Sequence, residues 1–463
     1  MLTAPLLPTA NLTHMLQLVS SGLGGMWLNL ASVKNAPAAP PAQAVTWQGL
    51  SWLNPAQGVE PGVEKTIAQY LQTLKTQGLN PQQQAIWLQT DNNLLIDRNG
   101  KIPVAAASLT KTATSLAALT TWGLDKQFET IVSANGKISQ GTLQGDLIVQ
   151  GGGDPLFVWE DAIALAQSLN QLGIDRVSGN LLVVDKFHMN YQAAPQKAGE
   201  LLKQALTGIN LPPALLTTEL KDVNIVKLPT APTATTTHLP QVKIAGKVIV
   251  ASAPPPVITP LIRHRSLPLL DIVRQMNIYS NNEIAQILAD SVGGTEQVMK
   301  IVATTAKFPA AEIQLINGSG LGVQNRLSPR AICQIFRTLH QTLQPVNLNL
   351  ADIFPVAGTE AIGTLKDRHL PIGATIKTGT LNGVSALGGV VPTRDRGLVW
   401  FVILNKGTQI PKLRQQQDTL LQTLLATWGT VTPTPLVVTK HDRAPAYFGD
   451  PDRNIAIVPK SPS

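Results

Sequence analysis

The sequence has little cysteine and little charge. Its single cysteine, Cys333, excludes a disulfide framework and a four-cysteine metal site. Charged residues make up 14% of the chain, whereas about 25% is typical of globular domains. The net charge is +8, but the basic residues are dispersed, and no run of them marks a nucleic-acid-binding arm. With 44% hydrophobic residues over 463 positions, we expect a folded chain of more than one domain that binds no nucleic acid.

The sequence also lacks the spacings that mark metal and cofactor sites. None of its seven histidines stands in an H-E-x-x-H arrangement. The run Gly-Gly-Gly-Asp-Pro at 151–155 is not followed by the lysine that a phosphate-binding loop requires, so it predicts a tight turn. We therefore expect no metal and no organic cofactor.

Long apolar runs are scarce, and the one near the N-terminus is atypical. Residues 15–31 are largely apolar and lead into small residues and prolines that end with Ala42-Gln43-Ala44, as in an export signal with its cleavage site. Residues 1–33 contain no lysine or arginine, however, and a signal normally begins with a positive region. We expect 1–44 to be an export leader or a flexible N-terminal segment, and the protein to lie in the periplasm or cell envelope. No other uninterrupted apolar run approaches about 18 residues, so no further membrane span is expected.

Hydrophobic periodicity predicts a mixed α/β fold. Short apolar runs separated by turn residues predict a hairpin at 84–90 and 94–97, and three antiparallel strands at 372–379, 384–391 and 398–404. Helical spacing covers residues 63–74, 105–122 and 413–428, and further helices are expected after Ser266 as a cap, around Ile284, and after Ser328-Pro329.

Changes in composition and hydrophobic pattern divide the chain into segments. Residues 125–256 consist of short β-like runs broken by glycine, with only 162–172 clearly helical, so we expect an inserted, mainly β domain there. Residues 45–124 and 257–430 are expected to form one discontinuous domain, in which helices cover an antiparallel sheet. The tail at 431–463 is rich in proline and polar residues and is assigned no fold.

Ser108 and Lys111 form a Ser-x-x-Lys pair in the first turn of the helix expected at 105–122. Three positions apart on a helix, the two side chains lie on one face. Burial and the positive field of the helix N-terminus would lower the pKa of the lysine, which could then take the proton of the serine hydroxyl. The pair predicts a serine nucleophile with an amine base. About one such pair arises by chance in a chain of this length, so a capping serine beside a solvated lysine is the alternative on this motif alone.

Two further motifs suit the same chemistry. Lys377-Thr378-Gly379-Thr380 lies in an expected strand, where the glycine lets a substrate approach the backbone and the cation and hydroxyls can hold a carboxylate. Ser280-Asn281-Asn282 lies between two expected helices, after the first motif and before the second. We select this Ser-x-Asn triplet for its position, because the same pattern also begins at Ser133, Ser168 and Ser178.

In this order, on a helix, an interhelical loop and a strand, the three motifs resemble the penicillin-recognising serine enzymes. The long stretch between Lys111 and Ser280 leaves room for an inserted domain, which is similar to the class C low-molecular-mass penicillin-binding proteins, the D-alanyl-D-alanine carboxypeptidase/endopeptidase family S13. The run at 151–155 and Asn317-Gly318-Ser319-Gly320-Leu321 resemble the same family, and the texture of the chain resembles its cyanobacterial members. The resemblance implies a β-lactamase/transpeptidase-like domain with an inserted mainly β domain.

The resemblance also implies the activity and its acylation centre. The protein would be a serine-type D-Ala-D-Ala carboxypeptidase, with or without endopeptidase activity, that acts on peptidoglycan stem peptides and is acylated by β-lactams. Ser108 would attack the carbonyl of the penultimate D-alanine, and Lys111 would be its general base. Ser280 and Asn282 would relay protons and position the substrate.

The strand motif would bind the other end of the substrate. By the same resemblance, Lys377 and Thr378 would favour the terminal carboxylate, beside Gly379. The backbone N–H groups of Ser108 and Thr380 would form the oxyanion hole.

The chain departs from the family in a short insertion and in Asn317, where many relatives have aspartate. The short insertion puts endopeptidase activity in doubt. A serine β-lactamase is the alternative enzyme, although no E-x-x-L-N segment lies between Asn282 and Lys377 to supply a deacylating base. A catalytically silent wall-binding protein of the same fold is the alternative from another class.

Overall fold

The computed structural model describes residues 60–212, 239–443 and 446–457, all within the compact unit Pro55–Ser463. The leader expected at 1–44 lies outside the described residues. Within the part of the chain that is described, we find no helix with both the length and the apolar character needed to cross a bilayer.

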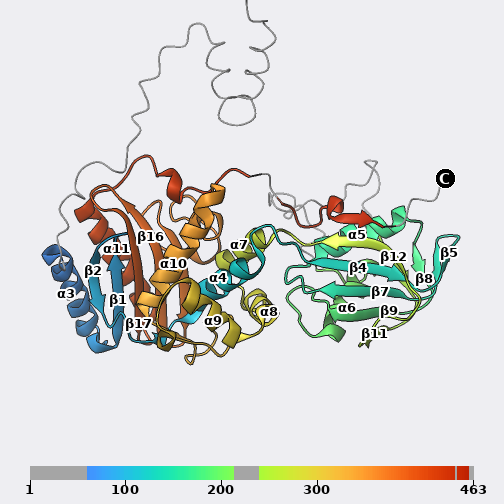
Figure 1. The fold of residues 1–463 in the computed structure, drawn as a ribbon, viewed down its shortest axis with the longest axis horizontal. Coiled ribbons are helices and arrows are strands. Elements are labelled where there is room, and N and C mark those ends of the chain that lie inside the picture. Colours follow the sequence, from blue (N-terminus) through green and yellow to red (C-terminus); the bar gives the residue numbers. More distant parts are fainter. Residues whose placement is uncertain (1–59, 213–238, 444–445, 458–463) are drawn as a thin grey trace, which may run out of the picture. The chain divides into compact units, whose positions relative to one another are not determined.

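A five-stranded antiparallel sheet forms the first layer of the fold (Figure 1). The predicted meander and the predicted hairpin are both present, and they join through one pair of strands that brings distant parts of the chain together. The meander begins at Thr375, three residues later than expected, because Ile372 is exposed and precedes a turn at Gly373. In spatial order the strands are β15 (Thr375–Leu381), β16 (Val384–Thr393), β17 (Gly397–Lys406), β1 (Gln84–Gln89) and β2 (Leu94–Arg98).

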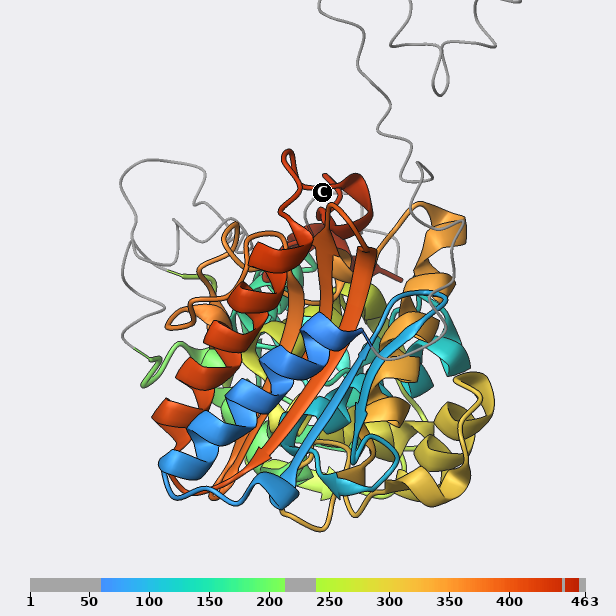
Figure 2. The same ribbon diagram turned by 90° about the vertical axis from the view of Figure 1, so that its left-hand side faces the viewer.

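Helices cover both faces of this sheet, because successive strand residues point to opposite sides. Ile376 and Phe401 face a core shared with the helices α3 and α11, which lie across the strands in the view of Figure 2. Ala386 and Trp400 face a second core shared with α4 and α10. The four helices are α3 (Pro61–Thr76), α11 (Ile410–Trp428), α4 (Thr110–Trp122) and α10 (Pro329–Leu343).

The helix α4 is buried from Thr110 to Leu119. Its alanines and threonines are small, so neighbouring helices approach closely. These neighbours include α7 (Leu269–Tyr279), α8 (Asn282–Val292) and the unpredicted α9 (Thr295–Thr305).

The predicted helix cap at Ser266 is wrong. The helix α7 begins at Leu269 after Pro268. The hydroxyl of Ser266 instead accepts a hydrogen bond from the backbone N–H of Phe128 at 2.9 Å, and its backbone N–H donates to the Phe128 carbonyl. Ser266 therefore joins the end of the inserted segment to its beginning.

The inserted region contains two sheets, and it has more helix than its sequence suggested. The helix expected at 162–172 is α5 (Trp159–Gln171), but α6 (Pro195–Thr207) was not foreseen. Gly199 lies within α6, and the structure explains this glycine, because a Cβ there would lie 2.6 Å from Val248 Cγ1. In spatial order the smaller sheet holds β10 (Lys243–Ile244), β8 (Arg176–Val177), β6 (Thr142–Gln144) and β5 (Lys137–Ser139).

The larger sheet of this region has six strands with parallel and antiparallel pairs. It extends past residue 256, where the sequence placed the end of the insertion. The strands in order are β11 (Val248–Ala251), β9 (Leu181–Lys186), β7 (Leu147–Gly152), β4 (Glu129–Ala134), β12 (Thr259–Arg265) and β18 (Asn454–Ala456).

The C-terminal tail, which was assigned no fold, supplies the edge strand β18 of this sheet. Arg453 forms a buried ion pair with Asp161, and the N–H of Gly449 donates to the same carboxylate at 2.8 Å. The side chain of Asn454 lies 2.7 Å from Nδ1 of the buried His264. Prolines and polar residues hid this strand in the sequence, because its stabilising partners lie nearly two hundred residues earlier.

Candidate active site

The turn that carries Ser108 is held close to the edge strand β15. Ser108 lies in a short 3₁₀ turn, Ala107–Leu109, just before α4 begins at Thr110, and not within the α-helix as expected. Ala107 adopts φ of 47°, a conformation that non-glycine residues rarely take and that is often found at functional sites. A Cβ at Gly379 would lie 2.9 Å from the backbone nitrogen of Ser108, so only glycine allows this approach.

Lys111 occupies a fully buried site behind Ser108. Its ammonium donates to Ser108 Oγ at 2.9 Å, to Asn282 Oδ1 at 2.7 Å and to the Ser319 carbonyl at 2.8 Å. Burial lowers the pKa of Lys111 to about 7, against a smaller opposing effect of the Glu283 carboxylate. A lysine with this pKa is partly neutral near pH 7, and as a free amine it can accept the serine proton.

The interhelical triplet places its three side chains in three different contacts. Ser280 ends α7 in a left-handed conformation, with φ of 55°, and its hydroxyl accepts a hydrogen bond from Lys377 Nζ at 3.0 Å. Asn281 caps α8 by accepting from the backbone N–H of Ile284. Asn282, the first residue of α8, turns to Lys111. The sharp left-handed turn therefore separates the contacts of Ser280 and Asn282.

Lys377 is as deeply buried as Lys111. Its ammonium donates to Ser280 Oγ and, at 2.8 Å, to the carbonyl of Thr378. Burial, reinforced by the nearby charge of Lys111, holds the pKa of Lys377 well below its usual value. Two lysines thus share one low-dielectric site, and their mutual repulsion favours a state with fewer than two charges.

The segment after Asn317 forms the back of the site, where the Ser319 carbonyl accepts from Lys111. Asn317 Oδ1 accepts from the N–H groups of Ser319 and Gly320 at 3.2 and 2.8 Å, which a carboxylate could also do. Its amide Nδ2 donates to the Leu321 carbonyl at 2.7 Å, which a carboxylate could not do. Asparagine is therefore compatible with this loop. Gly320 is required, since its φ is +83° and a Cβ there would lie 1.9 Å from the Ala107 carbonyl.

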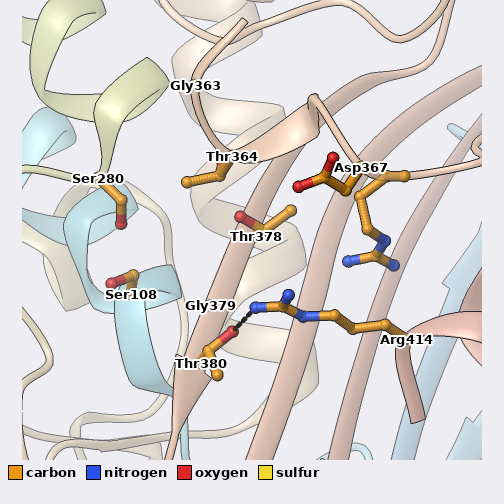
Figure 3. Close-up of a pocket in the computed structure, with 10 residues that line it drawn as sticks. Ser108, Ser280, Gly363, Thr364, Asp367, Thr378, Gly379, Thr380 and Arg414 are labelled. Atoms are coloured by element: carbon orange, nitrogen blue, oxygen red, sulfur yellow. Dashed lines mark hydrogen bonds between the residues drawn. The ribbon is translucent and has the colours of Figure 1, made fainter. Parts of the chain in front are cut away.

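These elements surround a pocket of about 300 Å³ (Figure 3). Among the residues predicted from sequence, Ser108, Ser280, Thr378, Gly379 and Thr380 line it. The structure thus brings all three motifs together, with Lys111, Asn282 and Lys377 just behind the lining. The lining residues that sequence reasoning missed are Gly363, Thr364, Asp367, Arg368 and Arg414.

The missed residues carry no local signal, because they lie outside any motif and reach the site only through the fold. Gly363 to Arg368 belong to a turn that packs against α7, and Arg414 belongs to the first turns of α11. Figure 3 shows Arg414 approaching Thr380 from the side opposite Ser108 and Ser280.

Cys333 is buried on α10, and burial raises the pKa of its thiol. Among the residues that the structure describes, we find no group of three or more His, Cys, Asp and Glu side chains arranged to hold a metal ion. The arrangement as a whole offers a hydroxyl next to an amine of lowered pKa, with a second buried amine beside a second hydroxyl. Such an arrangement can support covalent acyl transfer.

Comparison with known proteins places this geometry in context. The family model described as D-Ala-D-Ala carboxypeptidase 3 (S13) matches residues 64–228 and 230–427. The chain is 29% identical over 159 residues to carboxypeptidase DacB of Mycolicibacterium smegmatis, a match that covers 30% of this chain and 34% of that protein. It is 24% identical over 399 residues to D-alanyl-D-alanine carboxypeptidase DacB of Haemophilus influenzae, covering 66% of this chain and 81% of that protein.

Among solved structures, the chain is similar in fold to the penicillin G-acylated predatory endopeptidase Bd3459 of Bdellovibrio bacteriovorus, solved with the immunity protein Bd3460. The superposition has a TM-score of 0.67 at 22% identity and covers 80% of this chain and 98% of that chain. At this identity the likeness concerns the arrangement of helices and strands.

Proposed function

Because this chain belongs to the D-Ala-D-Ala carboxypeptidase 3 (S13) family, we propose that it is a serine-type D-Ala-D-Ala carboxypeptidase that acts through an acyl-enzyme on Ser108. Its substrates are peptidoglycan stem peptides, and β-lactams acylate the same hydroxyl. The observation that carries the proposal is the 2.9 Å contact between Ser108 Oγ and the ammonium of Lys111, whose pKa burial lowers to about 7.

Acylation begins when neutral Lys111 takes the proton of Ser108 and Oγ attacks the carbonyl carbon of the penultimate D-alanine. The backbone N–H groups of Ser108 and Thr380 receive the oxyanion. The tetrahedral intermediate collapses as the C–N bond breaks and the leaving amine of the terminal D-alanine takes up a proton. Ser280, which contacts Lys377, and Asn282, which contacts Lys111, position the two lysine amines that relay this proton.

Deacylation needs a water molecule that attacks the ester on Ser108 and regenerates its hydroxyl. In a serine β-lactamase a positioned general base makes this step fast. Among the described residues that line the pocket, Asp367 is the one carboxylate, and it belongs to the turn beside α7 and not to α4 or α8. This arrangement supports slow release of a penicilloyl group. It therefore favours a penicillin-binding peptidase over a β-lactamase.

Mass spectrometry of the intact protein after exposure to benzylpenicillin tests the proposal. We expect one long-lived penicilloyl adduct per chain, which peptide mapping places on the peptide that contains Ser108. The same preparation should release D-alanine from a stem pentapeptide. Rapid penicillin turnover without a persistent adduct would favour the β-lactamase, and the absence of both adduct and D-alanine release would favour the silent wall-binding protein. An adduct on any other peptide would contradict the assignment of Ser108.

The rate of acylation by benzylpenicillin should depend on pH through Lys111. Lys111 can accept the serine proton only as a neutral amine, and the neutral fraction falls about tenfold for each pH unit below the pKa. The second-order rate constant is therefore expected to rise between about pH 5 and pH 7 and to level off above about pH 7 to 8. Stopped-flow or quenched reactions measure this profile, and thermal unfolding over the same range controls for loss of structure. A flat profile would contradict the use of Lys111 as base.

The substrate class supports an envelope location, since stem peptides belong to the cell wall. Export to the periplasm, like endopeptidase activity on cross-links and a cyanobacterial origin, stays a prediction.

A further inference from the structure

A carboxypeptidase must recognise the free carboxylate next to the bond it cleaves, and the buried position of Lys377 raises the question of which cation does so. The ammonium of Lys377 has no exposed surface and already donates to Ser280 Oγ and the Thr378 carbonyl. Lys111 is equally enclosed by Ser108, Asn282 and Ser319. Lys111 therefore uses all three of its donors, and Lys377 keeps one but exposes no surface to the pocket.

Two other cations line the pocket, and one of them already forms an ion pair with a buried carboxylate. Arg368 forms a two-pronged ion pair with Asp418, with Nε at 3.0 and 3.2 Å from the carboxylate oxygens, and it also donates to Gln417. Its side chain is only 4% exposed. Removing it from Asp418 would leave a buried carboxylate without its partner, which is costly. Arg368 is therefore a structural element of the pocket wall.

Arg414 differs from these three cations. It is exposed, lines the pocket, and donates from Nη2 to Thr380 Oγ1 at 2.7 Å. Within residues 60–212, 239–443 and 446–457, no acidic side chain lies within ion-pairing distance of its guanidinium. Arginine remains charged at any pH at which an enzyme works, so it supplies a permanent positive charge at the pocket surface.

The sheet explains how α11 delivers this residue. Thr378 and Thr380 alternate with Ile376, whose side chain faces the core under α3 and α11, so all three share that face of β15. Gly379 faces the opposite side, toward Ser108. The pocket therefore spans the edge of the sheet: the nucleophile approaches from one face, and the guanidinium from the other (Figure 3).

From this juxtaposition we infer that Arg414 is the carboxylate receptor of the active site. This inference rests on the proposed function. Arg414, together with the hydroxyls of Thr378 and Thr380, binds the carboxylate of the residue that follows the scissile bond. A guanidinium offers parallel N–H donors that match the two oxygens of a carboxylate. The contact with Thr380 orients these donors before the substrate arrives, which lowers the entropic cost of binding.

The opposite charge in the pocket is consistent with this assignment. Asp367 lines the pocket on the turn beside α7, apart from Thr380 in Figure 3. A ligand carboxylate placed near Thr380 would be attracted by Arg414 and kept away from Asp367. The two groups thus define the orientation of a bound peptide terminus.

A pair of substrates tests the inference: a D-Ala-D-Ala-terminated peptide, and the same peptide with a C-terminal carboxamide. For Arg414→Gln we expect kcat/KM on the carboxylate peptide to fall by about 10- to 100-fold, the effect of losing a charge-assisted hydrogen bond. On the carboxamide peptide, kcat/KM should stay close to that of the wild type, so the preference for carboxylate collapses. Arg414→Lys should retain part of the preference.

Lys412→Gln is the matched control, because it removes the same charge from an exposed position two residues away on α11 that does not line the pocket. It should leave both substrates unaffected. The inference would be overturned if Arg414→Gln lowered kcat/KM equally for both peptides, or if it changed kcat/KM for neither peptide. Failure of the proposed function is distinguishable, since wild-type protein would then release no D-alanine from either peptide and form no penicilloyl adduct.

Discussion

Replacing Ser108 with alanine is expected to abolish acylation by benzylpenicillin and to lower kcat for D-alanine release by about 10⁴- to 10⁶-fold, the loss typical of removing a serine nucleophile. The physical reason is that no other hydroxyl in the pocket contacts Lys111: Ser280, the other serine of the lining, contacts Lys377 instead. Neither hydroxyl can be exchanged for the other without rearranging α7 and α4.

The measurements are intact-protein mass after exposure to penicillin and D-alanine release from a pentapeptide. Ser139→Ala is the matched control, because Ser139 is an exposed residue of β5 outside the pocket and the chemical change is the same. The control should acylate at the wild-type rate. A penicilloyl adduct that persists in Ser108→Ala would place the nucleophile elsewhere, and D-alanine release at the wild-type rate in that variant would support a reaction that does not pass through this serine.

Replacing Lys111 with methionine is expected to lower the rate of penicillin acylation by about 10²- to 10⁴-fold, the contribution typical of a general base. Methionine keeps an unbranched side chain in the buried site while removing the amine that contacts Ser108 Oγ. The change also removes the repulsion that Lys111 exerts on Lys377, so the pKa of Lys377 should move back up toward its usual value.

Stability separates a base from a purely structural residue. Burying the lysine charge is costly, and methionine removes that cost, although it leaves Asn282 Oδ1 and the Ser319 carbonyl without their donor. We therefore expect the acylation rate to fall much further than Tm. Lys75→Met on the exposed side of α3 is the control for a change of charge and should alter neither. Acylation by Lys111→Met at the wild-type rate would contradict the mechanism.

Local patterns were sufficient for most of the five-stranded sheet and the helices that cover it. The meander, the hairpin and the helices α3, α10 and α11 follow hydrophobic periods that each segment carries within itself. The same holds for the serine cap of α10, since Ser328 accepts from the N–H of Ala331 as its position before proline predicts. The sequence predictions failed where a segment depends on a distant partner. Ser266 forms a hydrogen bond with Phe128 instead of capping α7, and α6 contains a glycine that only the neighbouring strands require.

By itself, the sequence was enough to select the residues that meet in the pocket, because a Ser-x-x-Lys pair, a Ser-x-Asn triplet and a Lys-Thr-Gly run are local patterns with chemically specific side chains. Only the tertiary structure decided how those side chains behave. Burial lowers the pKa of Lys111 and encloses Lys377 beside Ser280 and the Thr378 carbonyl. The packing of α11 brings Arg414 to Thr380, on the face of β15 opposite Ser108. The tail likewise became a strand only through β12. Burial and long-range contact arise from segments far apart in the chain, and no local pattern can encode them.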